Sequence, residues 1–257
     1  MASRSVAQDP RVLDLIRSVH NLSEIVERPY TLSLIAQHIP KIERWKLEGR
    51  RVSGVMLYRE MVLEWLERDA GKHHLTPEHK CELMEHFAAE LWRTGEKSWS
   101  VGQLEQWLID YLRTHPQIDA HYTDKTRDLL KEDLRTATFL VREGDDRFRF
   151  AHTSLQEYFL ACHLQRALLA GDADTWALPE LNRETLDFLG QLLLTDGDDR
   201  VLAGLRLLRD AYRQIAAEDP DRCVLIDASA SPDAVAAQVW TALRDHLFAI
   251  ATTATPA

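Results

Sequence analysis

The chain has 257 residues, of which 45% are hydrophobic and 28% charged, and its formal net charge is -10. A chain of this length and balance folds around one large core or two to three small ones. Its acidic surface repels phosphate backbones and anionic membranes, so nucleic acid and membranes are disfavoured as partners unless a local basic patch exists.

Three cysteines, Cys81, Cys162 and Cys223, are few and far apart, and the first ten residues lack the apolar core of a secretory signal. No apolar run approaches the roughly 20 residues that a membrane span needs. We therefore expect a cytoplasmic protein with reduced thiols.

The first part of the chain predicts a helical bundle. One helix is expected to start at Asp9-Pro10 and a second near residues 21–24. Pro29 lacks the N–H that an interior position would need, so it starts a helix over 31–39 or lies in its first turn. Amphipathic helices are then expected over the ranges 55–69 and 78–94, ending near Gly71 and Gly95 respectively.

After residue 95 the pattern changes. A helix around Leu104 to Leu112 and another over about 123–136 precede a predicted hairpin in 137–150. In the hairpin, Phe139 and Val141 lie at alternate positions before a Glu-Gly-Asp-Asp turn. Phe148 and Phe150 lie at alternate positions after it. Two helices followed by a hairpin are typical of a winged helix domain.

Beyond Gly171 the pattern is again helical. The expected fold class is mainly α: a helical bundle, a winged helix domain with one β-hairpin, and then further helices. We expect three domains: a helical domain over 1–72, the winged helix domain over 73–170, and a second helical domain with a C-terminal tail over 171–257.

Enzyme motifs are missing from the sequence. The one Gly-Lys pair, Gly71-Lys72, is followed by His73 where a phosphate-binding loop needs a hydroxyl, and no G-x-S-x-G, H-E-x-x-H or Rossmann glycine cluster occurs. Cys162 and its neighbour His163 point about 100° apart on a helix, which favours a buried core cysteine over a nucleophile. We expect no catalytic residue in this chain.

A metal site is not expected either. Four metal-ligand side chains are close in sequence but match no common zinc spacing: His73, His74, His79 and Cys81.

A winged helix raises the question of DNA binding. Residues 124–135, which would enter the major groove, carry four basic and four acidic side chains, and the hairpin carries three of each. Such a surface releases few counterions, so we expect it to bind protein or a neighbouring domain. A DNA-binding regulator with helical flanks, and a stand-alone protein-interaction adaptor, remain the alternatives.

The stretch FAHTSLQEYFLA, residues 150–161, places His152 beside a predicted helix N-terminus. Thr153 with Gln156, and Ser154 with Glu157, each form a capping-box frame. Free N–H groups at such an end, together with an imidazole, suit contact with one phosphate group. The alternative is that His152 only caps the helix or packs, as we expect of Gln156 and Glu157.

Three segments together resemble the C-terminal half of NACHT-type STAND nucleoside triphosphatases, relatives of the NOD-like receptors. They are ERPYTLSLIA, LYREMVLEWLERD and FRFAHTSLQEYFLA, within about residues 10–170. The last is the most specific, because it resembles the F-x-H-x-S-x-Q-E segment of the family's winged helix.

This resemblance implies a regulatory, non-catalytic signalling module that controls a switch between an ADP-bound closed state and an ATP-bound open, oligomerising state. By resemblance, Pro29 lies near the adenine and His152 contacts the β-phosphate of ADP. The implied partners are the protein's own nucleotide-binding domain and other protomers, and the implied setting is bacterial anti-phage defence.

The Walker A and Walker B segments of the family are missing from this sequence. ADP or ATP with Mg²⁺ would therefore be held only by a full-length parent. We expect the chain to be a fragment of such a parent rather than a shortened product that cannot hold nucleotide alone.

Overall fold

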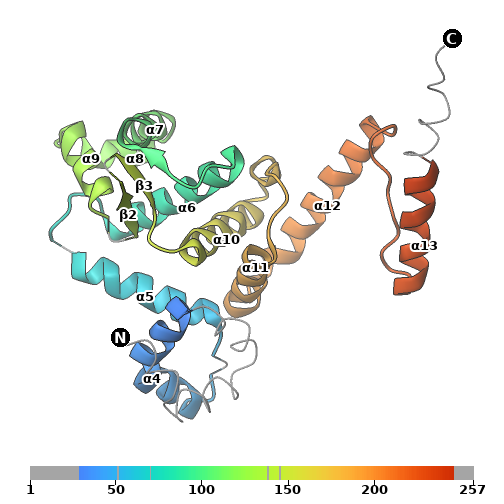
Figure 1. Ribbon diagram of the computed structural model, residues 1–257, viewed down its shortest axis with the longest axis horizontal. Coiled ribbons are helices and arrows are strands. Elements are labelled where there is room, and N and C mark those ends of the chain that lie inside the picture. Colours follow the sequence, from blue (N-terminus) through green and yellow to red (C-terminus); the bar gives the residue numbers. More distant parts are fainter. Residues whose placement is uncertain (1–28, 51, 70, 138, 145, 246–257) are drawn as a thin grey trace. The chain divides into compact units, whose positions relative to one another are not determined.

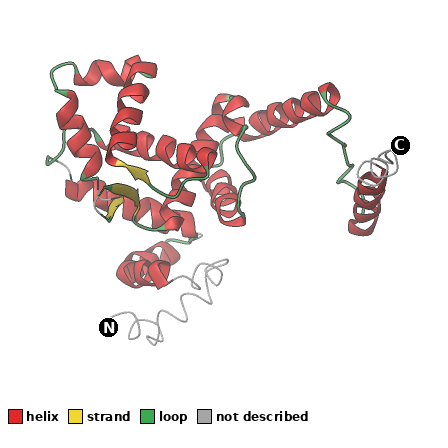
Figure 2. Cartoon of the chain, turned by 45° about the horizontal axis from the view of Figure 1, so that its top comes forward, coloured by secondary structure: helices red, strands yellow, loops and turns green. Residues whose placement is uncertain are grey.

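The computed structural model (Figure 1) describes residues 29–245 except for 51, 70, 138 and 145. Helices make up most of this part of the chain, and three short strands form its sheet (Figure 2), which confirms the mainly α fold class. The helices expected near Pro10 and residues 21–24 lie outside the described residues.

The chain divides into two compact units. The first extends to Ala167 and also includes Thr175–Asp198, and the second comprises Leu168–Asp174 and the residues from Asp199 onward. The helix that follows the hairpin therefore begins in the first unit and ends in the second.

The first described helix runs further than expected. Helix α4 (Pro29–Leu47) begins at the expected proline but continues through Pro40, although proline removes one hydrogen bond from a helix. The residues after this proline account for the difference, because Ile42 is fully buried and Trp45 is 4% exposed. Burial of this apolar face outweighs the local penalty.

Helices α5 (Gly54–Asp69) and α6 (Pro77–Thr94) follow the predicted boundaries. Thr76 caps α6 by accepting a hydrogen bond from the His79 N–H at 3.3 Å. Gly95 ends α6 with a φ of 70°, a left-handed conformation that glycine adopts without strain.

Helix α7 (Val101–Thr114) was expected, but the next helix is shorter than predicted. The segment after α7 forms α8 (Pro116–Asp119), the short 3-10 helix η1 (Ala120–Tyr122) and α9 (Arg127–Arg135). Tyr122 is 4% exposed and its hydroxyl accepts a hydrogen bond from the Thr76 N–H at 3.1 Å. This anchoring of η1 turns the chain before α9 begins.

The sheet has three antiparallel strands in the order β1-β3-β2. Strands β2 (Leu140–Glu143) and β3 (Arg147–Phe150) form the expected hairpin, while β1 (Trp99–Ser100) was not predicted. On β3 the two phenylalanines are buried as expected, but on β2 the buried residue is Leu140, and Val141 is half-buried. The alternation expected for Phe139 and Val141 is therefore not seen in the burial of β2.

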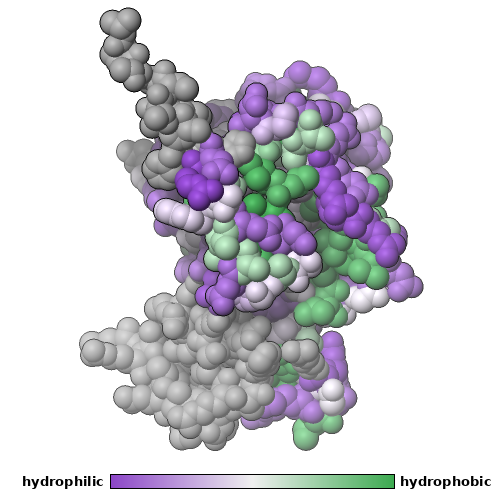
Figure 3. All heavy atoms as spheres, turned by 90° about the vertical axis from the view of Figure 1, so that its right-hand side faces the viewer, coloured by the Kyte–Doolittle hydropathy of each residue, from purple (hydrophilic) through white to green (hydrophobic). Residues whose placement is uncertain are grey.

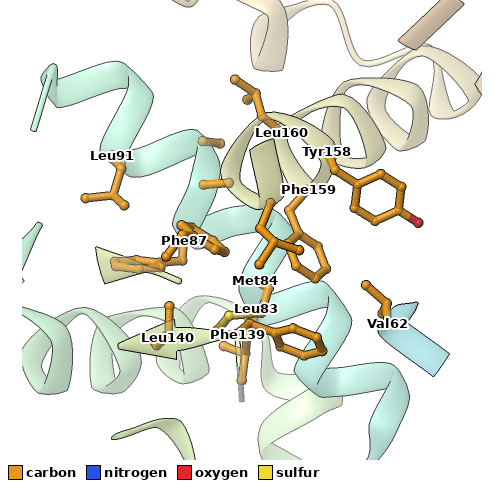
Figure 4. Close-up of a cluster of buried hydrophobic side chains, with 14 of the residues drawn as sticks. Val62, Leu83, Met84, Phe87, Leu91, Phe139, Leu140, Tyr158, Phe159 and Leu160 are labelled. Carbon is orange, nitrogen blue, oxygen red and sulfur yellow. The ribbon is translucent and has the colours of Figure 1, made fainter. Parts of the chain in front are cut away.

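Helices α10 (Thr153–Ala170) and α11 (Arg183–Asp196), with the 3-10 helix η2 (Asp174–Trp176) between them, follow the hairpin. Figure 4 shows how side chains from α6, the hairpin region and α10 meet in the core of the first unit. The Phe139 and Phe159 rings lie 5.2 Å apart. Full burial of such a side chain stabilises the fold by about 1.5–3 kcal/mol, so this cluster anchors the hairpin to α10.

The second unit contains α12 (Arg200–Glu218) and α13 (Pro232–Leu243). Large apolar side chains on both helices are exposed, among them Leu202 at 64% and Trp240 at 61%. On the face drawn in Figure 3, hydrophobic and hydrophilic residues are interspersed. No helix among the described residues is both long enough and apolar enough to cross a bilayer.

Candidate functional site

The site lies at the junction between β3 and α10. The N–H of Ala151 donates a hydrogen bond to the Phe139 carbonyl at 2.8 Å, which ties the end of the hairpin to its beginning. The N–H of Leu155 donates to the His152 carbonyl at 3.0 Å and closes the first turn of the helix. His152 therefore occupies the capping position of α10, as the expected nearness of the helix N-terminus implied.

The cap of α10 is the His152 ring itself. Its Nδ1 atom accepts a hydrogen bond from the Ser154 N–H at 3.2 Å, the contact that an Asn or Asp side chain makes at this position in other helices. Thr153 and Ser154, which begin the two capping-box frames, already belong to the first turn of the helix.

The Ser154 hydroxyl joins the cap to another helix. Its Oγ lies 2.6 Å from His152 Nδ1 and accepts a hydrogen bond from the Tyr58 hydroxyl at 2.6 Å. Tyr58 and Ser154 are each 1% exposed, so water does not compete for these bonds. A continuous hydrogen-bonded path therefore runs from α5 to the His152 ring.

Aromatic packing holds Tyr58 in place. Its ring stacks on Tyr158 at a centroid distance of 5.5 Å and meets the edge of Phe188 at 4.9 Å. The backbone N–H of Val55 also donates to the Gln191 side chain at 3.1 Å, which joins α5 to α11. Tyr58 is thus fixed by both α10 and α11.

The sequence did not single out Tyr58 as part of this site. It is 96 residues away from Ser154 along the chain, and no local pattern relates the two. The one available signal was that both lie in segments resembling the same family, LYREMVLEWLERD and FRFAHTSLQEYFLA.

The second residue predicted for nucleotide contact is Pro29. It is the first residue of α4, as expected for a proline at a helix start. Its side chain lies outside the described part of the structure. Its place near an adenine therefore stays a prediction.

The residues that follow His152 pack and bind other helices. Leu155 and Phe159 are buried, as expected for the apolar faces of α10. Glu157 is 3% exposed and accepts a hydrogen bond from Asn182 at 2.8 Å. Asn182 in turn caps α11, because its side chain accepts from the Thr185 N–H at 2.9 Å.

The cysteines of the first unit lack the character of nucleophiles. Burial raises the pKa of the Cys162 thiol, and burial raises that of Cys81 to about 12. A catalytic cysteine needs a lowered pKa, since the thiolate is the attacking form. Both residues therefore remain neutral thiols near pH 7.

The histidines near Cys81 make structural contacts. His73 Nδ1 lies 2.6 Å from the Lys80 ammonium, and His79 Nδ1 lies 2.6 Å from the Tyr122 hydroxyl. Within the described residues, no group of three or more histidine, cysteine, aspartate or glutamate side chains is arranged to hold a metal ion.

A comparison with protein families identifies the domain around this junction. Residues 62–164 match the model of the winged helix-turn-helix domain C-terminal to NACHT. The chain therefore contains a NACHT-associated winged helix domain. The match begins within α5 and ends within α10, so this winged helix domain includes His152 and Ser154.

Two curated relatives each match a short stretch of the chain. The chain is 68% identical over 40 residues to a thymidylate kinase of Bradyrhizobium diazoefficiens, a match that covers 16% of this chain and 18% of the kinase. It is 71% identical over 41 residues to a thymidylate kinase of Nitrobacter winogradskyi, with the same coverage. The chain spans less than a fifth of the length of these relatives. No solved structure matches the chain.

Proposed function

We propose that this chain is the regulatory, non-catalytic part of a STAND ATPase of the NACHT type. In this proposal it controls a switch between an ADP-bound closed state and an ATP-bound open state that oligomerises. ADP or ATP with Mg²⁺ is held by a nucleotide-binding domain outside this sequence. The partners are that domain and other protomers, and the setting is signalling, including anti-phage defence in bacteria.

The position of His152 within the NACHT-associated winged helix domain is the observation that supports this proposal best. The ring caps α10 at the positive end of the helix dipole, which favours an anion. A phosphate group contacted there links the nucleotide to the winged helix domain. Loss of that contact releases the domain, since a ligand shifts an equilibrium only through its different affinities for the two states.

The oligomeric state of the full-length protein tests the proposed switch. His152→Ala is expected to raise the fraction of large assemblies in excess ADP, because the closed state loses a phosphate contact. His74→Ala is the matched control, since His74 is an exposed histidine in the same unit. Light scattering after size-exclusion chromatography measures the result. Unchanged ADP affinity together with unchanged assembly size contradicts the proposal.

DNA binding is the alternative function for a winged helix domain. The ion pairs of the basic side chains on α9 argue against it. Arg135 pairs with Glu105 at 2.8 Å and with Glu132 at 2.6 Å, and Lys131 lies 3.4 Å from Glu105. Arg127 pairs with Asp119. Cations that already have acidic neighbours release few counterions from a DNA duplex, so they add little affinity.

We therefore expect weak binding of this chain to duplex DNA. Fluorescence anisotropy with a random-sequence duplex at low salt measures the affinity. The expected dissociation constant is weaker than about 1 µM even at low ionic strength. Tighter binding with a steep dependence on salt concentration favours a DNA-binding regulator instead.

A further inference from the structure

We propose that Tyr58 and Ser154 are positioning residues for His152, and that they hold its ring in the tautomer whose Nε2 carries the proton. This inference rests on the proposed function, because it specifies how His152 meets a phosphate group. His152 would then recognise the anion as a neutral N–H donor with a fixed direction.

The tautomer follows from the donors around Nδ1. The backbone N–H of Ser154 can only donate, and it points at Nδ1 from 3.2 Å. Nδ1 must therefore accept, so in the neutral imidazole the proton is on Nε2. If the His152 ring were protonated on both nitrogens, its Nδ1–H group would face the Ser154 N–H group. Both groups are donors, and the contact would lie at the positive end of the helix dipole.

The Ser154 hydroxyl strengthens this arrangement. The Tyr58 hydroxyl donates to Ser154 Oγ at 2.6 Å, which leaves the Ser154 proton to donate to His152 Nδ1, also at 2.6 Å. Hydrogen bonds in such a chain polarise one another. All three side chains thereby have a single consistent direction of donation, from Tyr58 to Ser154 to His152.

The hydrogen bonds to Nδ1 also explain why the Nε2–H group of His152 has a fixed direction. Nδ1 is held by two groups of α10 and, through Ser154, by α5. The ring is therefore fixed on its Nδ1 side by packed elements of one compact unit. A displacement of α5 would pull on this side of the ring, so the position of α5 and the nucleotide contact are coupled.

Nitrogen-15 NMR of the histidine ring in this chain tests the tautomer without any nucleotide. At about pH 8, where an ordinary histidine is neutral, His152 is expected to show a proton on Nε2 and an accepting Nδ1. Ser154→Ala should move the Nδ1 resonance because the hydroxyl donor is lost, and Tyr58→Phe should move it in the same direction by less.

The matched control is Tyr158→Phe. Tyr158 stacks on Tyr58, but its hydroxyl bonds with Cys162, so its loss should leave the His152 resonances in place. A proton on Nδ1 in the wild-type chain overturns the proposal. So does a His152 spectrum that neither Ser154→Ala nor Tyr58→Phe changes.

The release of ADP from the full-length protein supplies the functional readout. Loss of one neutral hydrogen bond corresponds to a change in rate of about three- to tenfold. Tyr58→Phe is therefore expected to speed ADP release by that factor. In a His152→Ala background the same substitution should have no further effect, since a positioning residue acts through the ring.

The two proposals fail in different ways. ADP release that is unchanged by His152→Ala contradicts the proposed function. Release that is sped by His152→Ala but not by Tyr58→Phe or Ser154→Ala overturns the positioning role alone. An effect of Tyr58→Phe that persists without the His152 ring also overturns it, because Tyr58 would then act through the fold in general.

Discussion

His152 combines two roles that the sequence presented as alternatives, a helix cap and a candidate phosphate contact. The ring caps α10 through Nδ1, and this leaves Nε2 as the nitrogen that carries the proton in the neutral form. The nearness of a helix N-terminus could be predicted from local sequence, because capping patterns are local. The contribution of Tyr58 could not, since it depends on the packing of α5 against α10.

A second group of histidines lies between α6, α7 and α10. The His86 ring meets His163 at 4.5 Å, His115 at 5.3 Å and Tyr111 at 4.9 Å. Burial is the largest cause of a pKa of about 3 for His86, and the neighbouring histidines and Arg166 contribute to the same lowering. Protonation of His86 therefore destabilises the folded chain relative to the unfolded chain.

Two neighbours of His86, Tyr111 and Arg166, each bond to a carboxylate. Tyr111 donates a hydrogen bond to Glu82 at 3.1 Å, and Arg166 pairs with Glu85 at 2.9 Å. Burial outweighs this pairing and raises the pKa of Glu85, whereas the bond to Glu85 raises the pKa of Arg166. Glu85 thus has its own pH dependence, with a sign opposite to that of His86.

The lowered pKa of His86 predicts a loss of stability in mild acid. In the unfolded chain the ring takes up a proton near about pH 6.5, but in the folded chain it does so only near pH 3. Between these values the unfolded state binds more protons, so the free energy of unfolding falls as the pH falls. The expected loss between about pH 7 and 5 is about 1–2 kcal/mol, allowing for solvent screening of a half-buried ring.

Urea unfolding at several pH values measures this effect. At each pH, the free energy of unfolding of His86→Gln is subtracted from that of the wild type. The contributions of Glu85 and of other groups common to both proteins then cancel. His86→Gln should lose the dependence between pH 7 and 5, whereas His74→Gln, at an exposed position, should retain it. Identical pH dependence in wild type and His86→Gln contradicts the assignment.

For the helices and strands, sequence patterns predicted those boundaries that depend on interactions within one turn of a helix. The caps Thr76 and Gly95 bound α6 as expected, because a cap acts within one turn. The continuation of α4 through Pro40 and the two-residue strand β1 were missed. Both depend on burial against residues distant in the chain, which residue propensities do not contain.

Two helical glycines give opposite predictions for the same substitution. Gly190 lies exposed inside α11 with nothing within 4 Å of an added Cβ. Gly204 lies in α12, where an added Cβ would be 2.2 Å from the Leu168 carbonyl oxygen. Helix propensity alone predicts stabilisation at both positions.

Gly190→Ala should therefore stabilise the protein by about 0.5–1 kcal/mol. Gly204→Ala should destabilise the second unit by about 1–3 kcal/mol, because α12 must move away from the backbone of α10. Thermal unfolding followed by circular dichroism compares the two variants. Equal stabilisation by both would mean that α12 does not approach Leu168 this closely.

At the scale of the whole chain, the two compact units differ in how they bury apolar residues. The large core cluster belongs entirely to the first unit, which also contains His152, Ser154 and Tyr58. Helices α12 and α13 of the second unit instead leave many large apolar side chains exposed. The mainly α class could be predicted from composition and spacing, whereas the division into units depends on contacts between segments far apart in the sequence.

The rate of ADP release from the full-length protein tests the central claim most directly. A hydrogen bond from His152 to a charged phosphate corresponds to about a ten- to hundredfold change in rate, so His152→Ala should release ADP faster by that factor. His74→Ala should release it at the wild-type rate. Equal rates for wild type, His152→Ala and His74→Ala would contradict the claim that His152 contacts the nucleotide.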